Sequence, residues 1–210
     1  MYHRNMHRHR IKLSCYLGLL SCLTLSQSVC LGEPIVWEFS EGGNGHSYES
    51  FLLPENTPWS VAKSFAEFQG GHLATLTNQA ELDWVFDHIA SDPDLWFTDS
   101  FNFLAGPYLG AFQNTSSPDY TEPDGGWEWV TGEEWNFTSW ASGQPNDVGS
   151  QGALHFWSRM SAGIAPTWQD INNDGGLNSP RSMIVEYVPA PGTLVFSLAG
   201  LLCATHRIRD

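Results

Sequence analysis

Two stretches in the first half of the chain carry apolar residues at the spacing of a helix face. In the first stretch these residues are Trp59, Ala62, Phe65 and Ala66. Thr57 and Pro58 come directly before them, and we expect the Thr57 hydroxyl to cap a helix that starts with Pro58. In the second stretch the apolar residues are Leu82, Val85, Phe86 and Ile89. Asn78 and Glu81 precede that stretch as a capping-box pair, so the pattern predicts two helices.

The rest of the central region has short apolar runs between turn-forming residues, without helical periodicity. The runs that predict strands are residues 72–76, 108–112, 127–130, 154–157 and 183–187. Two helices early in the chain and strands after them indicate an α+β fold. Segments 131–153 and 159–182 are rich in Gly, Asn, Asp, Ser and Pro. Loops of that length in a compact domain indicate either that strands in them have gone unrecognised or that the loops are functional.

The N-terminal segment has the organisation of a secretory signal. Four basic residues fall within residues 1–12, residues 13–31 are uncharged and mostly apolar or small, and Gly32 precedes the first acidic residue. A basic start, an apolar stretch and a small residue at the end are typical of a cleaved signal peptide. We therefore assign residues 1–32 to a signal peptide. The alternative is an anchor helix that stays on the protein.

The C-terminal segment, residues 189–210, combines a proline hinge, a short uncharged apolar run and a basic end. The apolar run is shorter than the roughly 20 residues that span a bilayer. This segment resembles the PEP-CTERM sorting signal of Gram-negative bacteria, although Ala190 stands where that signal usually has Glu. The resemblance implies export to the cell envelope and a transient membrane tether. The alternative is a final helix that packs on the domain.

Composition leaves a globular acidic domain between these ends. Apolar residues make up 41% of the chain, enough for a packed core. Residues 33–189 contain 22 Asp and Glu but only three basic residues, which disfavours nucleic acid and anionic lipid as partners. The four cysteines are Cys15, Cys22, Cys30 and Cys203. All of them lie outside residues 33–188, so we expect neither a disulfide framework nor a cysteine zinc site in that domain.

Several short motifs follow one another in a characteristic order. They are Trp-x-x-Ala at 59–62, Gly-His-Leu at 71–73, Tyr-Leu-Gly-Ala at 108–111, Gly-Trp-Glu-Trp at 126–129, Trp-x-x-Gly-Gln-Pro-Asn-Asp at 140–147, His-Phe at 155–156, Trp-Gln-Asp at 168–170 and Ile-Val-Glu-Tyr at 184–187. Together they resemble the C-type lectin-like domain over roughly residues 45–188. The resemblance implies two helices, short antiparallel sheets and a long ligand-binding loop in residues 33–188.

The resemblance places paired replacements at the family's conserved cysteines. Ala66 and Val185 stand at one pair of positions, and Ala153 and Asn173 stand at the other. Loss of both members of each pair is what a disulfide-free variant requires. The core must then supply the roughly 2–4 kcal/mol that each bridge typically contributes, and we expect the Trp and Phe residues to do this.

In this family, sugar binding uses a Ca²⁺ ion held by the long loop, and the ion's open positions take two sugar hydroxyls. The resemblance implies that Gln144, Asn146 and Asp170 would ligate such an ion. Gln144-Pro145-Asn146 is a hybrid of the mannose-type and galactose-type loops, so it assigns no sugar, and the family's proline is cis. Gln169 replaces the Asn of the family's Trp-Asn-Asp motif.

One acidic ligand of the family is missing from this loop, because Gln151 or Gly152 stands at its position. Calcium affinity depends on the number of carboxylates, so we expect a dissociation constant of about 10⁻⁴–10⁻³ M or weaker. The predicted carbohydrate-binding residues are Gln144, Asn146, Asp147, Gln151, Gln169 and Asp170. The alternative is that these polar side chains only hydrogen-bond a structural loop.

Three classes of function remain after these steps. The first is an exported, weakly or modestly calcium-dependent protein that binds a glycan or glycoconjugate. The second is a calcium-independent module on the same fold that binds protein or has a structural role at the surface. The third is an enzyme, supported only by scattered acidic residues. We assign no catalytic residue and expect the protein not to be an enzyme.

Overall fold

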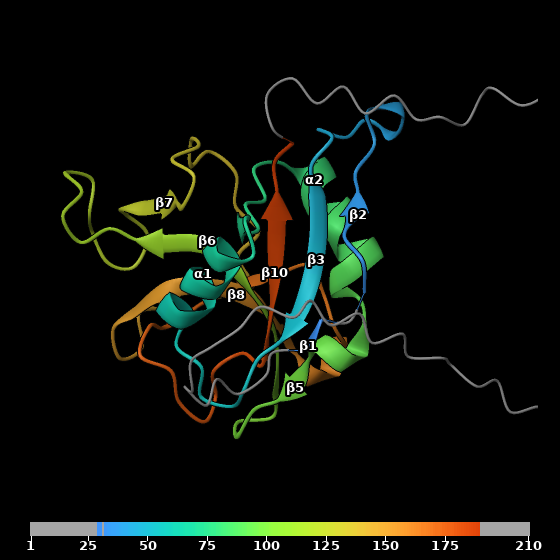
Figure 1. Cartoon of the computed structure of the whole chain (residues 1–210). Coiled ribbons are helices and arrows are strands. Elements are labelled where there is room, and N and C mark those ends of the chain that lie inside the picture. The colour runs from blue at the N-terminus through green and yellow to red at the C-terminus, as the bar shows by residue number, and fades with distance from the viewer. Residues whose placement is uncertain (1–28, 31, 190–210) are drawn as a thin grey trace, which may run out of the picture.

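The computed structural model describes residues 29–30 and 32–189 (Figure 1). The two predicted helices are α1, Trp59–Phe68, and α2, Gln79–Val85, and α2 continues into the π-helical turn η2, Phe86–Ala90. The short 3-10 turns are η1, Phe39–Glu41, η3, Pro93–Leu95, and η4, Met160–Ala162. Most of the predicted signal peptide and nearly all of the predicted tether lie outside the described residues. No helix among the described residues is long and apolar enough to cross a membrane.

The helix starts were predicted with one error. Asn78 caps α2 as expected, because its side-chain oxygen accepts the backbone N–H of Glu81 at 3.0 Å. The prediction that Thr57 caps α1 is wrong. The Thr57 hydroxyl instead donates to the carbonyl of Pro54 at 2.7 Å. Pro58 occupies the capping position with an extended backbone, so the helix begins one residue later than predicted.

Ten strands form one mixed sheet, in the order β1-β3-β10-β6-β8-β9 with four short strands at its sides. The strands are β1, Val29–Cys30; β2, Ile35–Val36; β3, Ser47–Leu52; β4, His72–Leu73; β5, Phe97–Thr98; β6, Phe103–Gln113; β7, Trp127–Trp129; β8, Gln151–Arg159; β9, Trp168–Asn172; and β10, Ser182–Tyr187. All five predicted strands are present. The predicted strand at 72–76 is shorter than expected. Five strands were not predicted, namely β1, β2, β3, β5 and β9.

The central strands bury side chains on both faces. In β10, Ile184 packs into the cluster that contains the apolar face of α2, whereas Met183 and Val185 pack into the cluster that contains α1. Alternation of side chains across a strand produces this division. Figure 1 shows β3 and β10 side by side between the two helices. A strand covered on both faces reads as a continuous apolar run, and Met-Ile-Val at 183–185 has that pattern.

The core consists largely of aromatic and small side chains. Ala66 and Val185, which replace one expected cysteine pair, are both fully buried in the same cluster. Trp129 and Trp168 are fully buried in the other cluster, with their ring centroids 5.9 Å apart in an edge-on arrangement. The other Trp residues are buried or half-buried. Burial of these aromatic rings stabilises a domain that contains no cysteine and therefore no disulfide bond.

Candidate functional site

Asp170 joins the long loop to β9. The Asp170 side chain is 1% exposed, and its Oδ2 accepts the backbone N–H of Asn146 at 3.0 Å and that of Asp147 at 2.7 Å. Burial raises the pKa of the Asp170 carboxyl, while the two N–H groups oppose that rise. The structure therefore brings together three of the predicted site residues, but it does so through the backbone of the loop.

The side chains of this loop also bond to the loop itself. The backbone N–H of Val148 donates to both Asn146 Oδ1, at 3.1 Å, and Gln151 Oε1, at 3.0 Å. Asp147 Oδ1 accepts the backbone N–H of Gln151 at 2.9 Å. Asp147 has a φ of 46°, in the left-handed region that Asp tolerates better than most residues. The loop is thus closed by its own hydrogen bonds, and the Gln144–Pro145 peptide bond is cis.

These residues offer few free oxygen atoms to a calcium ion. Gln144 Oε1 is buried and has no hydrogen-bond partner, so it could serve as a ligand. The carboxylate of Asp170 and the side-chain oxygens of Asn146 and Asp147 named above already accept backbone N–H groups. Calcium takes six to eight oxygen ligands and binds more tightly when several are carboxylates. As arranged, the loop does not fit a calcium ion.

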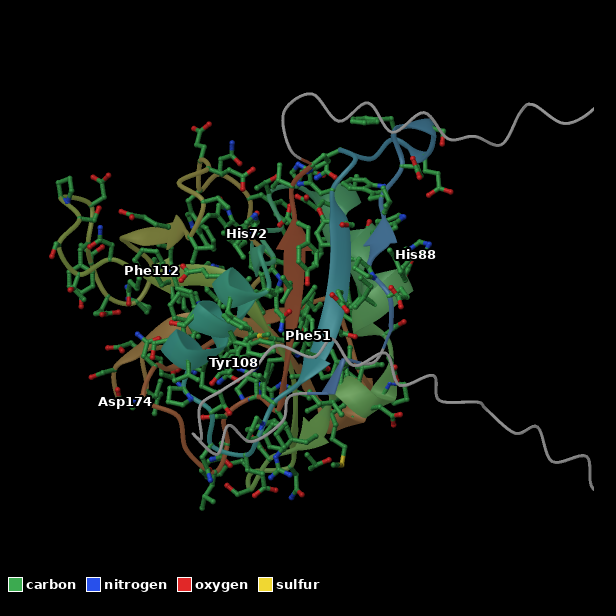
Figure 2. All side chains as sticks on the ribbon, viewed as in Figure 1. Phe51, His72, His88, Tyr108, Phe112 and Asp174 are labelled. Carbon is green, nitrogen blue, oxygen red and sulfur yellow. The ribbon has the colours of Figure 1, made fainter. Side chains whose placement is uncertain are left out.

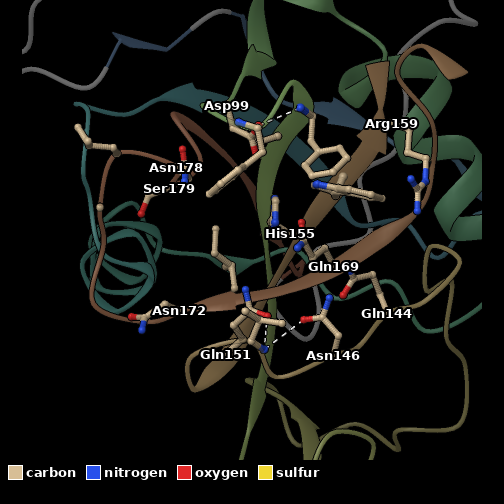
Figure 3. Close-up of a pocket in the computed structure, with 18 of the residues that line it drawn as sticks. Asp99, Gln144, Asn146, Gln151, His155, Arg159, Gln169, Asn172, Asn178 and Ser179 are labelled. Carbon is tan, nitrogen blue, oxygen red and sulfur yellow. Dashed lines mark hydrogen bonds between the residues drawn. The ribbon is translucent and has the colours of Figure 1, made fainter. Parts of the chain in front are cut away.

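A cavity of about 640 Å³ lies beside this loop. Four of the predicted carbohydrate-binding residues line it, namely Gln144, Asn146, Gln151 and Gln169. Asp147 and Asp170 are not among its lining residues. Along β9, Trp168 and Asp170 are buried, whereas Gln169 and Ile171 line the cavity, as alternation across a strand requires. Figure 3 shows the four amides at the cavity, whereas the carboxylates of Asp147 and Asp170 support the loop from outside it.

The other residues in the wall of the cavity were not predicted as site residues. They include Asp99, Phe103, His155, Trp157 and Arg159. The last three are spaced two residues apart in β8, which places them on one face of the strand. The two-residue spacing of these side chains is visible in the sequence. It points to a shared cavity wall only once β6 is known to pair with β8.

His155 is fully buried in the wall of the cavity. Neither of its ring nitrogens makes a well-formed hydrogen bond to a described residue, although the Gly106 backbone and the Gln169 side chain act to raise its pKa. Burial lowers the pKa of His155 to about 4, because a low-dielectric environment disfavours the charged imidazolium. His155 is therefore neutral at pH 7.

A second polar cluster ties three segments together away from this cavity. His46 Nδ1 lies 2.6 Å from Glu186 Oε1, and the Tyr48 hydroxyl donates to Glu81 Oε1 at 2.7 Å. The three ionisable side chains His46, Glu81 and Glu186 have ligand atoms within 4.8 Å of one another. Their remaining carboxylate oxygens accept hydrogen bonds from Thr75 and Thr77. All four oxygens are thus satisfied within the fold, and the cluster is a structural tie.

Comparison with known proteins agrees with the lectin-like resemblance. No family model matches the sequence. A perlucin-like protein of Mytilus galloprovincialis is 27% identical over 122 residues, which are 58% of this chain and 66% of that protein. A C-type lectin of Micrurus corallinus is 26% identical over 131 residues, which are 60% of this chain and 68% of that protein.

A solved structure supports the same fold. The C-type carbohydrate-recognition domain of cow CD23, studied in the presence of an oligosaccharide, superposes with a TM-score of 0.50 at 13% identity. The match covers 78% of this chain and 99% of that domain. With its two helices and mixed sheet, the chain has the C-type lectin-like fold, as predicted. Of the two sequence relatives named above, that of Micrurus corallinus is a C-type lectin by name.

Proposed function

We propose that the protein binds carbohydrate in the cavity beside the long loop, and that it does so without calcium. The observation that carries this proposal is the convergence of Gln144, Asn146, Gln151 and Gln169 on one cavity. A side-chain amide both donates and accepts hydrogen bonds, as a sugar hydroxyl also does. A cavity with a few polar groups at its wall and apolar groups between them is typical of small-ligand sites.

Two aromatic side chains strengthen the carbohydrate proposal. Phe103 and Trp157 both line the cavity, and their ring centroids are 4.9 Å apart. Aromatic rings provide a large apolar surface on which the C–H face of a pyranose can lie. Amides for the hydroxyls and rings for the C–H face together match the two surfaces of a sugar. Direct contacts of this kind do not require the ion that the loop fails to accommodate.

A second candidate function is protein binding, which one feature of the surface favours. Phe101, Val148 and Leu177 all line the cavity and are 68%, 72% and 78% exposed. Exposed apolar side chains that gather around a cavity can mark an interaction site. This candidate predicts binding that free sugars do not compete with, so saccharide competition separates the two functions.

Binding of the purified protein to a panel of immobilised glycans, in EDTA and in calcium, tests the proposed function. We expect retention on at least one glycan under both conditions. The variant Gln169→Ala should weaken binding about threefold to tenfold, since a hydrogen bond typically contributes about 0.5–1.5 kcal/mol. The matched control is Gln79→Ala, because Gln79 is exposed on α2 and bonds only to Asp83. The proposal would be overturned if the protein bound no glycan on the panel and also bound no free sugar at about 10 mM, a concentration high enough to detect millimolar dissociation constants.

We also propose that residues 1–32 direct export and that residues 189–210 act as a sorting segment. Support comes from the basic, apolar and small-residue order at the N-terminus and from the proline, apolar and basic order at the C-terminus. Mass spectrometry of the protein recovered from the cell envelope checks this assignment. We expect a mature N-terminus near Gly32. An intact Met1 on the mature protein would contradict cleavage.

A further inference from the structure

One positively charged side chain at the cavity has no partner among the residues that the structure describes. The described residues include three Lys or Arg residues, Lys63, Arg159 and Arg181. Lys63 pairs with Glu67, and Arg181 pairs with Glu55 at 2.8 Å. The Arg159 guanidinium makes no ion pair or hydrogen bond to any described residue. In a domain where acidic residues outnumber basic ones so strongly, an Arg without a carboxylate partner is unexpected.

Arg159 is also placed where a ligand could reach it. It ends β8, is exposed, and lines the cavity together with Gln144 and Gln169, which lie on the same side in Figure 3. Asp99 lines the cavity too, but it does not neutralise Arg159. Asp99 Oδ1 instead accepts the backbone N–H groups of Phe101 and Phe103, each at 2.8 Å.

The rest of the wall adds no second positive charge. His155 is fully buried, makes no well-formed hydrogen bond to a described residue through either ring nitrogen, and is neutral at pH 7. The aromatic pair Phe103 and Trp157 is apolar, and the remaining polar wall consists mostly of amides. A ligand that uses the whole cavity therefore meets one guanidinium, several amides and an aromatic surface.

We propose that the cavity selects a saccharide that carries a carboxylate, and that Arg159 binds this carboxylate. The planar guanidinium presents paired N–H donors that match a carboxylate. The amides and rings would contact the hydroxyls and the C–H face of the same sugar. The ligand class is a pyranose with one acidic group, since the strong negative charge of the domain disfavours polyanions. This inference rests on the proposed carbohydrate binding and names its substrate class.

Uronic and sialic acids share this chemistry, so two matched pairs of sugars test the inference. We would titrate the full chain by calorimetry with a glucuronosyl-glucose disaccharide against cellobiose, and with sialyllactose against lactose. We expect at least one acidic sugar to bind about tenfold more tightly than its neutral partner, because hydrogen bonds between charged groups are stronger than those between neutral groups. The pair that shows this preference identifies the source of the carboxylate.

Substitutions separate the role of Arg159 from a general effect of charge. Arg159→Gln should remove the preference for the acidic sugar and leave affinity for the neutral sugar within about twofold. Lys63→Gln makes the same charge change on α1, where Lys63 pairs with Glu67, and should leave the preference intact. Raised salt should weaken binding of the acidic sugar only.

The possible outcomes distinguish this inference from the proposed function. Equal affinity for acidic and neutral sugars, or a preference that Arg159→Gln leaves unchanged, overturns the role of Arg159 while carbohydrate binding stands. No binding of any sugar in these pairs or on the glycan panel overturns both. Loss of all sugar binding in Arg159→Gln, with unchanged thermal unfolding, also contradicts selective recognition of the carboxylate, since the neutral sugar should still bind.

Discussion

Asp170 organises the long loop through its buried carboxylate. Its carboxylate is almost fully buried and accepts backbone N–H groups from Asn146 and Asp147. Hydrogen bonds between an anionic acceptor and backbone N–H groups are stronger than neutral ones. In this fold the bonds hold the segment after the cis Gln144–Pro145 bond against β9.

Removal of this carboxylate should destabilise the protein, whatever ligand it binds. We expect Asp170→Ala to lower the free energy of unfolding by about 3 kcal/mol, because backbone N–H groups left unpaired cost about 1–3 kcal/mol each. Urea unfolding measures the change. The control Asp174→Ala alters an exposed carboxylate whose oxygens make no hydrogen bond to a described residue, and should change stability by less than about 0.5 kcal/mol. Equal effects of the two substitutions would contradict the structural role of Asp170.

At the scale of elements, the cluster of His46, Glu81 and Glu186 connects the turn before β3 to α2 and β10. The Tyr48 hydroxyl lies between the two carboxylates, 2.7 Å from Glu81 Oε1 and 3.4 Å from Glu186 Oε1. Burial and the two carboxylates raise the pKa of Tyr48, so the hydroxyl stays protonated and can donate. The His46 ring closes the cluster on its more exposed side.

The stability that the interaction of His46 with Glu186 contributes should decrease as pH rises. The hydrogen bond to Glu186 raises the pKa of His46, with burial opposing and the charges of Glu186, Glu81 and Glu133 assisting. A raised pKa means that the stabilisation is fully present below pH 6.5 and is lost as pH rises through the folded-state pKa. We therefore expect the wild type to exceed His46→Gln by about 1.5 kcal/mol in unfolding free energy near pH 6, and to lose that advantage by pH 9.

The comparison needs a histidine substitution that does not remove an ion pair. His88 is suitable, because its Nδ1 lies 2.8 Å from the backbone carbonyl of Trp84 rather than from a carboxylate. Between pH 6 and pH 9 the advantage of the wild type should decline more over His46→Gln than over His88→Gln. A difference for His46→Gln that stays constant with pH would show that His46 acts only by packing.

The elements that sequence predicted are those whose burial leaves a periodic pattern. The helices were recognised because each buries one apolar face, and β10 because its two buried faces give an apolar run. β9 was missed because Gln169 lines the cavity while Asp170 supports the loop, so the strand reads as polar. Arg159 was missed as a cavity residue because its position depends on pairing between β6 and β8, which has register shifts. Such long-range contacts leave no local signal in a single sequence.

At the scale of the whole molecule, the fold maintains a lectin-like shape without disulfide bonds in its domain. Buried aromatic side chains fill one cluster next to α2, and α1 covers the other cluster with small and aromatic residues. The loop that adjoins the cavity is held by side-chain to backbone hydrogen bonds. The aromatic core and the hydrogen bonds of the loop both use groups of the chain itself. The domain should therefore reach its full stability without an added ion.

Thermal unfolding in EDTA, in 10 mM calcium and in 10 mM magnesium tests that expectation. A site with a dissociation constant of about 1 mM would add about 1.4 kcal/mol at about 10 mM ion by mass action, equivalent to a rise of about 3–6 °C in Tm for a domain of this size. We expect equal Tm values in calcium and in magnesium, because the carboxylates of Asp147 and Asp170 already accept backbone N–H groups. Any common shift reflects screening of the acidic surface. A rise specific to calcium that Gln144→Ala abolishes would instead establish a calcium loop, and the calcium-free mode of sugar binding would then be wrong.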